Sequence, residues 1–485
     1  MTPAHQVAIV GAGFAGLGMA ISLKRAGRHD FVVLEKAQSV GGTWRDNTYP
    51  GCHSDVPAML YSYSFAPNPD WTRTHPPQQE IWDYLKRCAD RYGVTEHIRF
   101  GAEVVRAEFD EGARLWQLSC ADGREVQARV LISAPGMLQV PAIPDFPGLE
   151  SFRGPTFHPA RWNHDVDLRG KRVAIIGNGS SAVQFIPHVV KVAEQVTAFQ
   201  RSAAWVLPGV NRRLTRIERA VHRLVPPLLR ARRTFTYWLF ESRVLGMAMF
   251  PSLSKAVAVL LRANIRRSVR DPDLARRLSP DYMLGCKRTV MGSGYYEALT
   301  QPNVNVITEH IREVSERGLI TADGIEHQAD VIIFGTGFQP AAGWLNQAII
   351  GVGGRSLTQA WESGVQAYLG VSVAGFPNLF LLAGPNTSLG HNSVIFMFEA
   401  QIRYVLRCLK VLSSHANSVL DVRLSAQQAF NKRLDRQFSN TVWSSGCTSH
   451  YLDATGRNYS IWPGFTFGYW LRTRKPRLAD YELVP

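Results

Sequence analysis

Two glycine-rich loops, at residues 11–16 and 177–182, restrict what this chain can fold into more than any other feature. Each loop follows a short apolar run and precedes a stretch compatible with a helix and then a second apolar run. This order predicts a βαβ unit, in which glycines permit a tight turn and the helix N-terminus attracts a phosphate. We therefore expect two dinucleotide-binding units in one chain.

The first loop is accompanied by an acidic residue at the expected distance. Its glycines Gly11, Gly13 and Gly16 have the GxGxxG spacing. Glu35 follows Gly16 by 19 residues and ends the second apolar run, where a carboxylate can bind the ribose hydroxyls of a dinucleotide. Because both apolar runs and the acid are in place, we predict a dinucleotide site here.

The second loop is accompanied by a cation instead of an acid. Arg201 and Ser202 follow the apolar run at 195–199, at the position equivalent to Glu35. A cation suits a 2′-phosphate, whereas a carboxylate would repel it, so the second dinucleotide is predicted to be NADP rather than NAD. The predicted nucleotide-binding residues of this loop are Gly177, Gly179, Ser180 and Ser181.

Composition agrees with a globular protein of more than one core. The chain has 485 residues, of which 45% are hydrophobic and 19% are charged. No basic segment followed by a long apolar stretch precedes the first apolar run, so we expect no secretory signal and a cytoplasmic protein.

The six cysteines are widely spaced. They include no CxxC pair, and the nearest two, Cys88 and Cys120, lie 32 residues apart. This spacing disfavours a zinc site, a redox-active dithiol and a disulfide-reductase flavoprotein, because each needs two sulfurs close together. We predict no metal ligands.

The formal net charge of +15 is concentrated in one segment. Residues 212–277 hold 15 Arg and one Lys against four acidic residues, which is a net charge of +12. No nucleic-acid-binding module is recognisable, so we expect no nucleic-acid partner. The apolar run at 244–261 contains Pro251 and Lys255 and therefore makes a poor membrane span. A solvated lid over the substrate tunnel is the favoured interpretation, and weak contact with an anionic membrane surface is the alternative.

The segment between the two loops carries a third pattern. Phe152, Gly154, His158 and Trp162 have the spacing Phe-x-Gly-x3-His-x3-Trp. This pattern resembles the fingerprint of the type I Baeyer–Villiger monooxygenases, which are class B flavoprotein monooxygenases that use FAD and NADPH. The match is imperfect at Asn163, where that family usually has Pro or Asp.

Residues 41–55 are similar to a second signature of the same family at every fixed position. The resemblance implies that Thr43 and Trp44 contact FAD, that Asp55 lies near the flavin ring, and that Tyr61 lies against the cofactor. The alternative is a surface loop rich in turn-forming residues, with Trp44 as a core side chain. We add two further residues to the predicted cofactor-binding set, Val104 and Asn386.

Lys287 and Arg288 stand where the resemblance places a Lys-Arg pair. It implies that Lys287 meets the NADP 2′-phosphate and that Arg288 reaches the flavin. We predict Arg288 and Asp55 as the catalytic residues, because a guanidinium can stabilise the anion that attacks a ketone and the oxyanion that results. Asp55 would orient Arg288 through a charge-assisted pair.

The C-terminal region departs from the family. Where the resemblance expects Ser-Trp-Tyr, with an indole against NADP, this chain has His450 between Ser449 and Tyr451. Trp443 and Trp462 are alternative candidates for the indole.

The expected fold is α/β, with two Rossmann-like dinucleotide-binding domains and a helical insert. The proline-rich stretch after residue 140 indicates the linker between the domains. The expected boundaries are 1–145 for the first part of the FAD-binding domain, 146–165 for the linker, 166–325 for the NADP-binding domain with its basic insert at 212–280, and 326–485 for the second part of the FAD-binding domain and the C-terminal segment.

The resemblance implies an NADPH- and FAD-dependent enzyme that inserts one oxygen atom of O2 next to a ketone carbonyl, giving an ester or lactone. A flavin monooxygenase that oxidises sulfur or nitrogen is the nearest alternative, although its linker usually ends in an aromatic residue other than Trp. A protein that binds both cofactors without turnover is the second alternative, and the two intact loops disfavour it.

Overall fold

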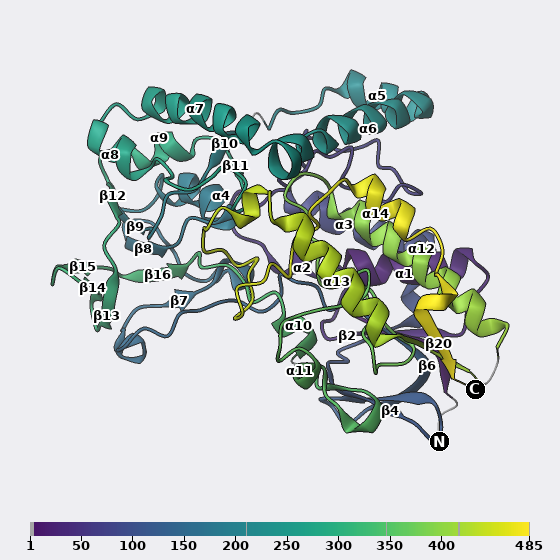
Figure 1. The fold of residues 1–485 in the computed structure, drawn as a ribbon. Coiled ribbons are helices and arrows are strands. Elements are labelled where there is room, and N and C mark those ends of the chain that lie inside the picture. The colour runs from purple at the N-terminus through teal and green to yellow at the C-terminus, as the bar shows by residue number, and fades with distance from the viewer. Residues whose placement is uncertain (1–3, 210, 346, 416–417, 485) are drawn as a thin grey trace.

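The computed structural model describes residues 4–209, 211–345, 347–415 and 418–484. The chain forms two units, each built on a largely parallel sheet, that lie side by side with a row of helices across one end of both (Figure 1). This arrangement confirms the predicted α/β fold with two Rossmann-like domains and a helical insert.

The first unit contains an eight-stranded sheet in the order β17-β4-β5-β6-β1-β2-β3, with β18 beside β6. Its central strands are parallel, and the hairpin of β5 with β6 is antiparallel. The interior strands are almost fully buried because helices cover the sheet, as expected for parallel pairing. The strands are β1 (His5–Val10), β2 (Phe31–Glu35), β3 (Ile98–Phe100), β4 (Val104–Asp110), β5 (Leu115–Cys120), β6 (Glu125–Ser133), β17 (Ile349–Ile350) and β18 (Leu379–Leu381).

The second unit contains a five-stranded, fully parallel sheet in the order β12-β9-β8-β16-β7. Its last two strands revise the expected boundaries. The strand β7 comes from the predicted linker, and β16 lies beyond residue 325, so the chain leaves this unit only after Phe334. The strands are β7 (Thr156–Phe157), β8 (Arg172–Ile176), β9 (Gln195–Phe199), β12 (Val304–Ile307) and β16 (Val331–Phe334).

Smaller sheets and helices complete both units. The small sheets of the second unit pair β10 (Val206–Pro208) with β11 (Val290–Gly292), and β13 (Ile311–Ser315) with β14 (Gly318–Thr321) and β15 (Glu326–Gln328); the C-terminal pair is β19 (Val419–Val422) with β20 (Tyr481–Val484). The helices outside the insert are α1 (Phe14–Arg25), α2 (Thr43–Asp46), α3 (Gln78–Arg91), α4 (Ser180–Val189), α9 (Tyr295–Leu299), α10 (Ala342–Leu345), α11 (Leu357–Ala360), α12 (Val394–Ser413), α13 (Leu424–Phe438) and α14 (Thr466–Arg472).

The basic insert is helical, and its prolines start helices rather than interrupt them. Pro226 and Pro251 occupy the first positions of their helices, where the missing N–H has no intrahelical partner to lose. No single described helix is long and apolar enough to cross a membrane; residues 226–249 and 251–268 meet that test only as a pair bent by 109°. The insert comprises α5 (Arg216–Leu224), α6 (Pro226–Glu241), the π-helical segment η4 (Leu245–Met249), α7 (Pro251–Ser268) and α8 (Pro272–Arg277).

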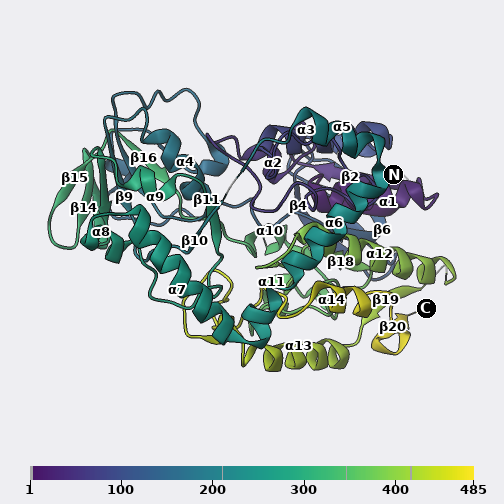
Figure 2. The same ribbon diagram turned by 90° about the horizontal axis from the view of Figure 1, so that it is seen from above.

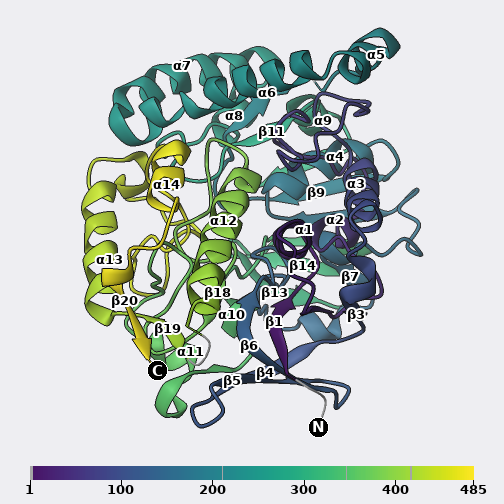
Figure 3. The same ribbon diagram turned by 90° about the vertical axis from the view of Figure 1, so that its right-hand side faces the viewer.

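A buried carboxylate fastens the insert to the first unit. Glu241, at the end of α6, is fully buried and accepts hydrogen bonds from Asn392 Nδ2 at 2.7 Å and from the backbone N–H and hydroxyl of Thr466. Burial alone would raise the pKa of Glu241, but the nearby His391 and these donors outweigh it and lower the pKa. In Figures 2 and 3 the insert accordingly lies close to α12 and α14.

The fingerprint histidine joins the linker to the point where the chain returns to the first unit. His158 Nδ1 accepts a hydrogen bond from Ala160 N at 3.1 Å, and Nε2 donates to Gly337 O at 2.9 Å. These contacts require a neutral imidazole. Burial lowers the pKa of His158 to about 4, and the positive charge of Arg161 acts in the same direction.

We expect His158 to make the protein sensitive to acid. Between pH 6.5 and about 4, His158 binds a proton in the unfolded chain but stays neutral in the folded protein. The free energy of unfolding therefore falls as the pH decreases, by up to about 3 kcal/mol for a pKa shift of this size. His158→Gln should flatten this part of the profile of unfolding midpoint against pH. The exposed His415→Gln is the control, and equal profiles for the wild type and His158→Gln would contradict the prediction.

Candidate functional site

The first glycine loop is shaped to accept a pyrophosphate. Gly11 has φ +98°, and a Cβ there would lie 2.5 Å from the carbonyl oxygen of Ala134. A Cβ at Gly16 would collide with the backbone of Gly11, whereas Gly13 has only Gly42 Cα within 4 Å, at 3.8 Å. The helix α1 begins after Gly13 without a side-chain cap, so its first N–H groups remain available to an anion. The loop therefore fits the phosphates of FAD.

Glu35 lies where the sequence predicts it, at the end of β2, and is buried. It accepts a hydrogen bond from Ala12 N at 2.7 Å and forms an ion pair with Arg45 Nη1 at 3.0 Å. The carboxylate thus orders the glycine loop, and Arg45 compensates its charge.

The residues of the second signature pack against this loop. Trp44 follows Thr43 in the short helix α2, and its Nε1 donates a hydrogen bond to the Tyr61 hydroxyl at 3.0 Å. The ring of Tyr61 also contacts the ring of Phe14, the first residue of α1, with centroids 5.3 Å apart. Thr43, Trp44 and Tyr61 are therefore adjacent to the predicted FAD phosphate site.

Val104 and Asn386 are both buried, and the contacts around them hold other parts of the chain in place. Val104 begins β4, two residues after Ala102, whose N–H donates to the backbone oxygen of Glu35 at 2.9 Å. Asn386 has φ +56° and donates through Nδ2 to Asn458 O at 2.8 Å and to Ile461 O at 3.1 Å. The side chain of Asn386 therefore holds the C-terminal loop in place.

The second glycine loop has the same construction. Gly177 has φ +103°, and a Cβ at this position would collide with the carbonyl of Gly335, just after β16. The helix α4 begins after Gly179 without a side-chain cap. Ser180 and Ser181 form its first turn, so the geometry of this loop suits a pyrophosphate, as that of the first loop does.

The Asp55 carboxylate connects three segments of the chain. It accepts hydrogen bonds from Ser180 Oγ at 3.2 Å, from Gln184 Nε2 at 3.1 Å and from Arg288 Nη2 at 3.3 Å. Its side chain is 11% exposed, whereas that of Arg288 is 42% exposed. Burial acts to lower the pKa of Arg288, but the charge and hydrogen bond of Asp55, together with Tyr451 and Tyr61, outweigh it and raise the pKa, so the guanidinium stays charged.

Gln184 is a site residue that the sequence analysis missed. It lies one helical turn after Ser180, on the same face of α4, and its Oε1 also accepts a hydrogen bond from the Tyr49 hydroxyl at 3.0 Å. In the sequence, only its spacing of one helical turn from Ser180 points to Gln184. That spacing does not distinguish a hydrogen-bond partner of Asp55 from an ordinary core residue.

The residues predicted for the NADP 2′-phosphate come together. Lys287 Nζ donates a hydrogen bond to Ser202 Oγ at 3.0 Å and lies over the ring of Tyr282 at 4.5 Å. Burial lowers the pKa of Lys287; the charge of Asp281 opposes this effect and that of Arg201 adds to it. Arg201, Ser202 and Lys287 therefore provide two cations and a hydroxyl for a phosphate.

His450 is electrostatically coupled to Arg288. The surrounding protein lowers the pKa of His450 to about 4, and the positive charge of Arg288 adds to this effect, so the imidazole is neutral at physiological pH. Trp443 and Trp462, the alternative candidates, are buried core side chains. Trp443 packs against Phe438 in a cluster under the insert.

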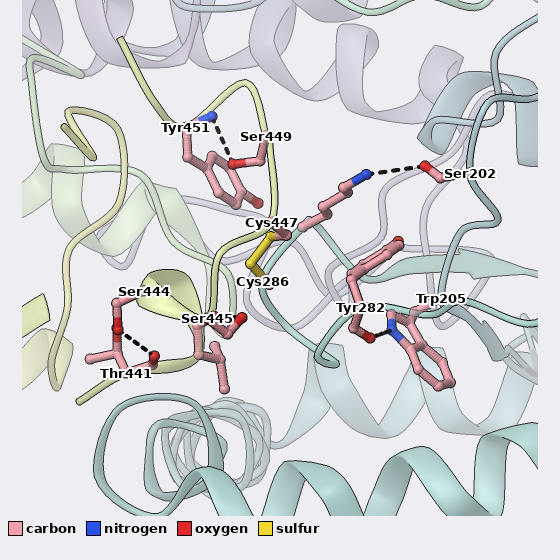
Figure 4. Close-up of a disulfide and its surroundings, with 12 residues drawn as sticks. Ser202, Trp205, Tyr282, Cys286, Thr441, Ser444, Ser445, Cys447, Ser449 and Tyr451 are labelled. Atoms are coloured by element: carbon pink, nitrogen blue, oxygen red, sulfur yellow. Dashed lines mark hydrogen bonds between the residues drawn. A yellow bond between two sulfur atoms is a disulfide. The ribbon is translucent and has the colours of Figure 1, made fainter. Parts of the chain in front are cut away.

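A disulfide joins the two segments that carry Arg288 and His450. Cys286 and Cys447 are 161 residues apart in sequence and form a disulfide with Cα atoms 6.4 Å apart (Figure 4). Cys286 comes two residues before Arg288, and Cys447 three before His450. The wide spacing of the cysteines along the chain gives no indication of this bond, because tertiary folding brings together cysteines that have no short spacing.

Comparison with known proteins places these features in context. A family model described as pyridine nucleotide-disulphide oxidoreductase matches residues 8–221. Proteins named Baeyer-Villiger monooxygenase from Streptomyces coelicolor and Pseudomonas aeruginosa are 44% and 43% identical; each alignment covers 99% of this chain, and 92% and 91% of the relative. The crystal structure of OTEMO in complex with FAD and NADP has a TM-score of 0.90 and 28% identity, with full coverage of both chains.

We expect Arg201 and Lys287 to determine the preference for NADPH. Arg201→Ala and Lys287→Ala should raise the KM for NADPH and leave the KM for NADH nearly unchanged, because only contacts to the 2′-phosphate are lost. Steady-state kinetics with both nucleotides measures this difference. Equal damage with the two nucleotides would remove the assignment.

We expect the number of free thiols to reveal the disulfide between Cys286 and Cys447. Unfolded protein without reductant should show four thiols, Cys52, Cys88, Cys120 and Cys408, and all six after reduction. Cys447→Ser should unfold at lower temperature, with a loss of about 2–4 kcal/mol, because the closed loop is long. Reductant should lower the unfolding temperature of the wild type but not that of Cys447→Ser. Six thiols without reductant would contradict the bond.

Proposed function

Because the chain belongs to the Baeyer–Villiger monooxygenase family, we propose that Asp55 and Arg288 carry the oxygen-insertion step of this NADPH- and FAD-dependent monooxygenase. The observation that supports this assignment is the ion pair between Arg288 and Asp55, held by Ser180 and Gln184 of the NADP-binding helix. The substrate class that this reaction needs is a small-molecule ketone, with O2 as the second substrate, and the product is an ester or a lactone.

When bound, FAD would supply the hydride-accepting and O2-activating chemistry of the reaction, with NADPH as the hydride donor. The residues of this chain bind and position: the loop of Gly11, Gly13 and Gly16 takes the FAD pyrophosphate, and the loop of Gly177 and Gly179 takes that of NADP. Arg201, Ser202 and Lys287 recognise the 2′-phosphate.

Arg288 supplies a cation that does not depend on pH. When a nucleophile adds to a ketone carbonyl, negative charge develops on the carbonyl oxygen, and a preorganised guanidinium stabilises it. Asp55 accepts from one nitrogen of Arg288 and leaves the other N–H donors available. Because Asp55 is itself held by Ser180 and Gln184, the guanidinium is fixed relative to the nicotinamide-binding unit.

We expect wild-type enzyme to convert members of a panel of linear, cyclic and aromatic ketones into esters or lactones. Arg288→Ala should still bind FAD and oxidise NADPH, while product formation falls by about 10²–10³, the usual cost of losing one preorganised charge-stabilising group. Arg288→Lys should not restore activity, because an ammonium lacks the planar fork that reaches Asp55 and the substrate together.

Product analysis by gas chromatography measures this outcome, with a thioether included in the panel. Near wild-type ketone conversion by Arg288→Ala would refute the role of Arg288. Oxidation of the thioether alone would favour the alternative of a heteroatom-oxidising enzyme.

We also propose that the insert at 212–277 makes a weak contact with an anionic membrane surface. Of the 25 large apolar side chains that are exposed in the described part of the chain, 14 lie in this segment. They include Phe235, 70% exposed, Trp238, 54% exposed, and Leu260, 70% exposed. With a net charge of +12, the segment combines apolar side chains with cations, which is the composition that binds anionic interfaces.

We expect the protein to sediment with phosphatidylglycerol vesicles and not with phosphatidylcholine vesicles, and the binding to weaken as salt increases. Phe235→Ser combined with Trp238→Ser should reduce the bound fraction several-fold. The control is Val192→Ser, which removes an exposed apolar side chain outside the insert. Equal binding to both kinds of vesicle, or unchanged binding of the double variant, would contradict the proposal.

A further inference from the structure

A basic pocket lies apart from the two dinucleotide loops. It has a volume of about 830 Å³ and is formed by residues of α12, α13 and α14 and by the segment that follows α14. Seven of its twelve lining residues are Arg or Lys, and none is Asp or Glu. In Figure 3 these three helices lie together on one side of the first unit. The lining contains no residue of either glycine loop and neither Asp55 nor Arg288.

The cations of this pocket have almost no counter-ions in the protein. Among the described residues, only Arg477 has a carboxylate within 4 Å, Asp480 at 3.9 Å, and that carboxylate also accepts a hydrogen bond from the Tyr368 hydroxyl. By contrast, many arginines elsewhere in the chain form ion pairs, such as Arg172 with Asp330 at 2.7 Å. The pocket therefore gathers like charges that the protein does not neutralise.

The repulsion acts between neighbouring side chains. Burial lowers the pKa of Arg403, the charges of Arg474 and Arg407 lower it further, and the charge of Glu399 opposes them only in part. Two of these guanidinium groups are nevertheless held in place, because Arg403 and Arg474 both lie over the ring of Trp470, at 4.5 and 5.4 Å from its centroid. Arg403 Nη2 also donates a hydrogen bond to Trp470 O at 3.4 Å. Isolated surface arginines are each surrounded by water, whereas Arg403 and Arg474 both pack against the ring of Trp470.

We propose that this pocket binds a ligand that carries a phosphate monoester or a diphosphate. A planar guanidinium group can bind two oxygens of one phosphate through two parallel hydrogen bonds. A ligand with at least two negative charges also reduces the repulsion among several cations at once. The volume lies within the range of about 300–1,000 Å³ that is usual for small-molecule sites. Trp470 and Phe430 provide apolar surface for the rest of the ligand. The proposal does not rest on the oxygenation reaction, because no residue of that reaction lines the pocket.

The first test is calorimetric titration of FAD-loaded enzyme with inorganic pyrophosphate, with NADP+ at saturation so that the 2′-phosphate site is occupied. We expect one further binding event. Arg407→Glu combined with Arg474→Glu should weaken it at least tenfold. Arg266→Glu combined with Arg267→Glu, which changes the net charge equally on α7, should leave it unchanged. Equal loss in both double variants would show a general charge effect and overturn the proposal.

A second measurement guards against misfolding of the pocket variant. Without ligand, replacing two cations that both repel Arg403 with carboxylates should keep or raise the unfolding temperature at low salt, and ketone turnover should remain at the wild-type level. Pyrophosphate should raise the unfolding temperature of the wild type but not that of the pocket variant. If pyrophosphate stabilises both proteins equally, the pocket is not the site.

The source of the phosphate is tested with vesicles of phosphatidic acid in phosphatidylcholine. Binding of vesicles that depends on Arg407 and Arg474, without binding of pyrophosphate, would identify a lipid headgroup as the ligand. Binding of pyrophosphate would identify a soluble phosphate compound. For the vesicles, the control of equal charge is Arg312→Glu combined with Arg317→Glu, two exposed residues outside the insert. If neither pyrophosphate nor the vesicles distinguish the pocket variant from its control, the proposal fails.

Discussion

The carboxylate of Asp55 is the contact on which the arrangement of the site depends. It belongs to the FAD-binding unit, and it receives hydrogen bonds from Ser180 and Gln184 of the NADP-binding unit and from Arg288 after the insert. A partly buried carboxylate is costly unless donors compensate its charge, so these three segments are held at one position. The same carboxylate that pairs with Arg288, the proposed catalytic cation, also links the segments that carry the two nucleotide loops.

Two further links support this arrangement from outside. Glu241 joins the insert to the first turns of α12 and α14, and the disulfide between Cys286 and Cys447 ties the Arg288 segment to the C-terminal loop. The insert therefore serves more than one purpose: η4 packs over the C-terminal cluster of Trp443, while the outer faces of α6 and α7 expose apolar side chains. The contact with the C-terminal cluster and the proposed membrane contact would therefore use different parts of the insert.

The positive charge of the protein is divided among places with different chemistry. Arg201 and Lys287 form a small site beside Ser202 that suits one phosphate. The insert spreads its arginines along helices with exposed apolar neighbours. The pocket at α12, α13 and α14 concentrates cations around Trp470 without acidic partners. Net charge alone does not distinguish these three basic regions; the side chains around each group of cations do.

From the sequence alone follow the local units: both glycine loops, the strands and helices around them, Glu35 at the end of β2, and Arg201 shortly after β9. These follow from short-range pattern, because a βαβ unit needs only its own apolar periodicity and glycine conformations. Contacts between distant segments were decided by the tertiary structure alone. Only the structure shows that β7 and β16 belong to the second sheet and that Gln184 is a hydrogen-bond partner of Asp55. Only the structure shows that Cys286 and Cys447, 161 residues apart in sequence, form a disulfide. It also gathered the basic pocket from three helices, since packing, and not spacing along the chain, selects which side chains meet.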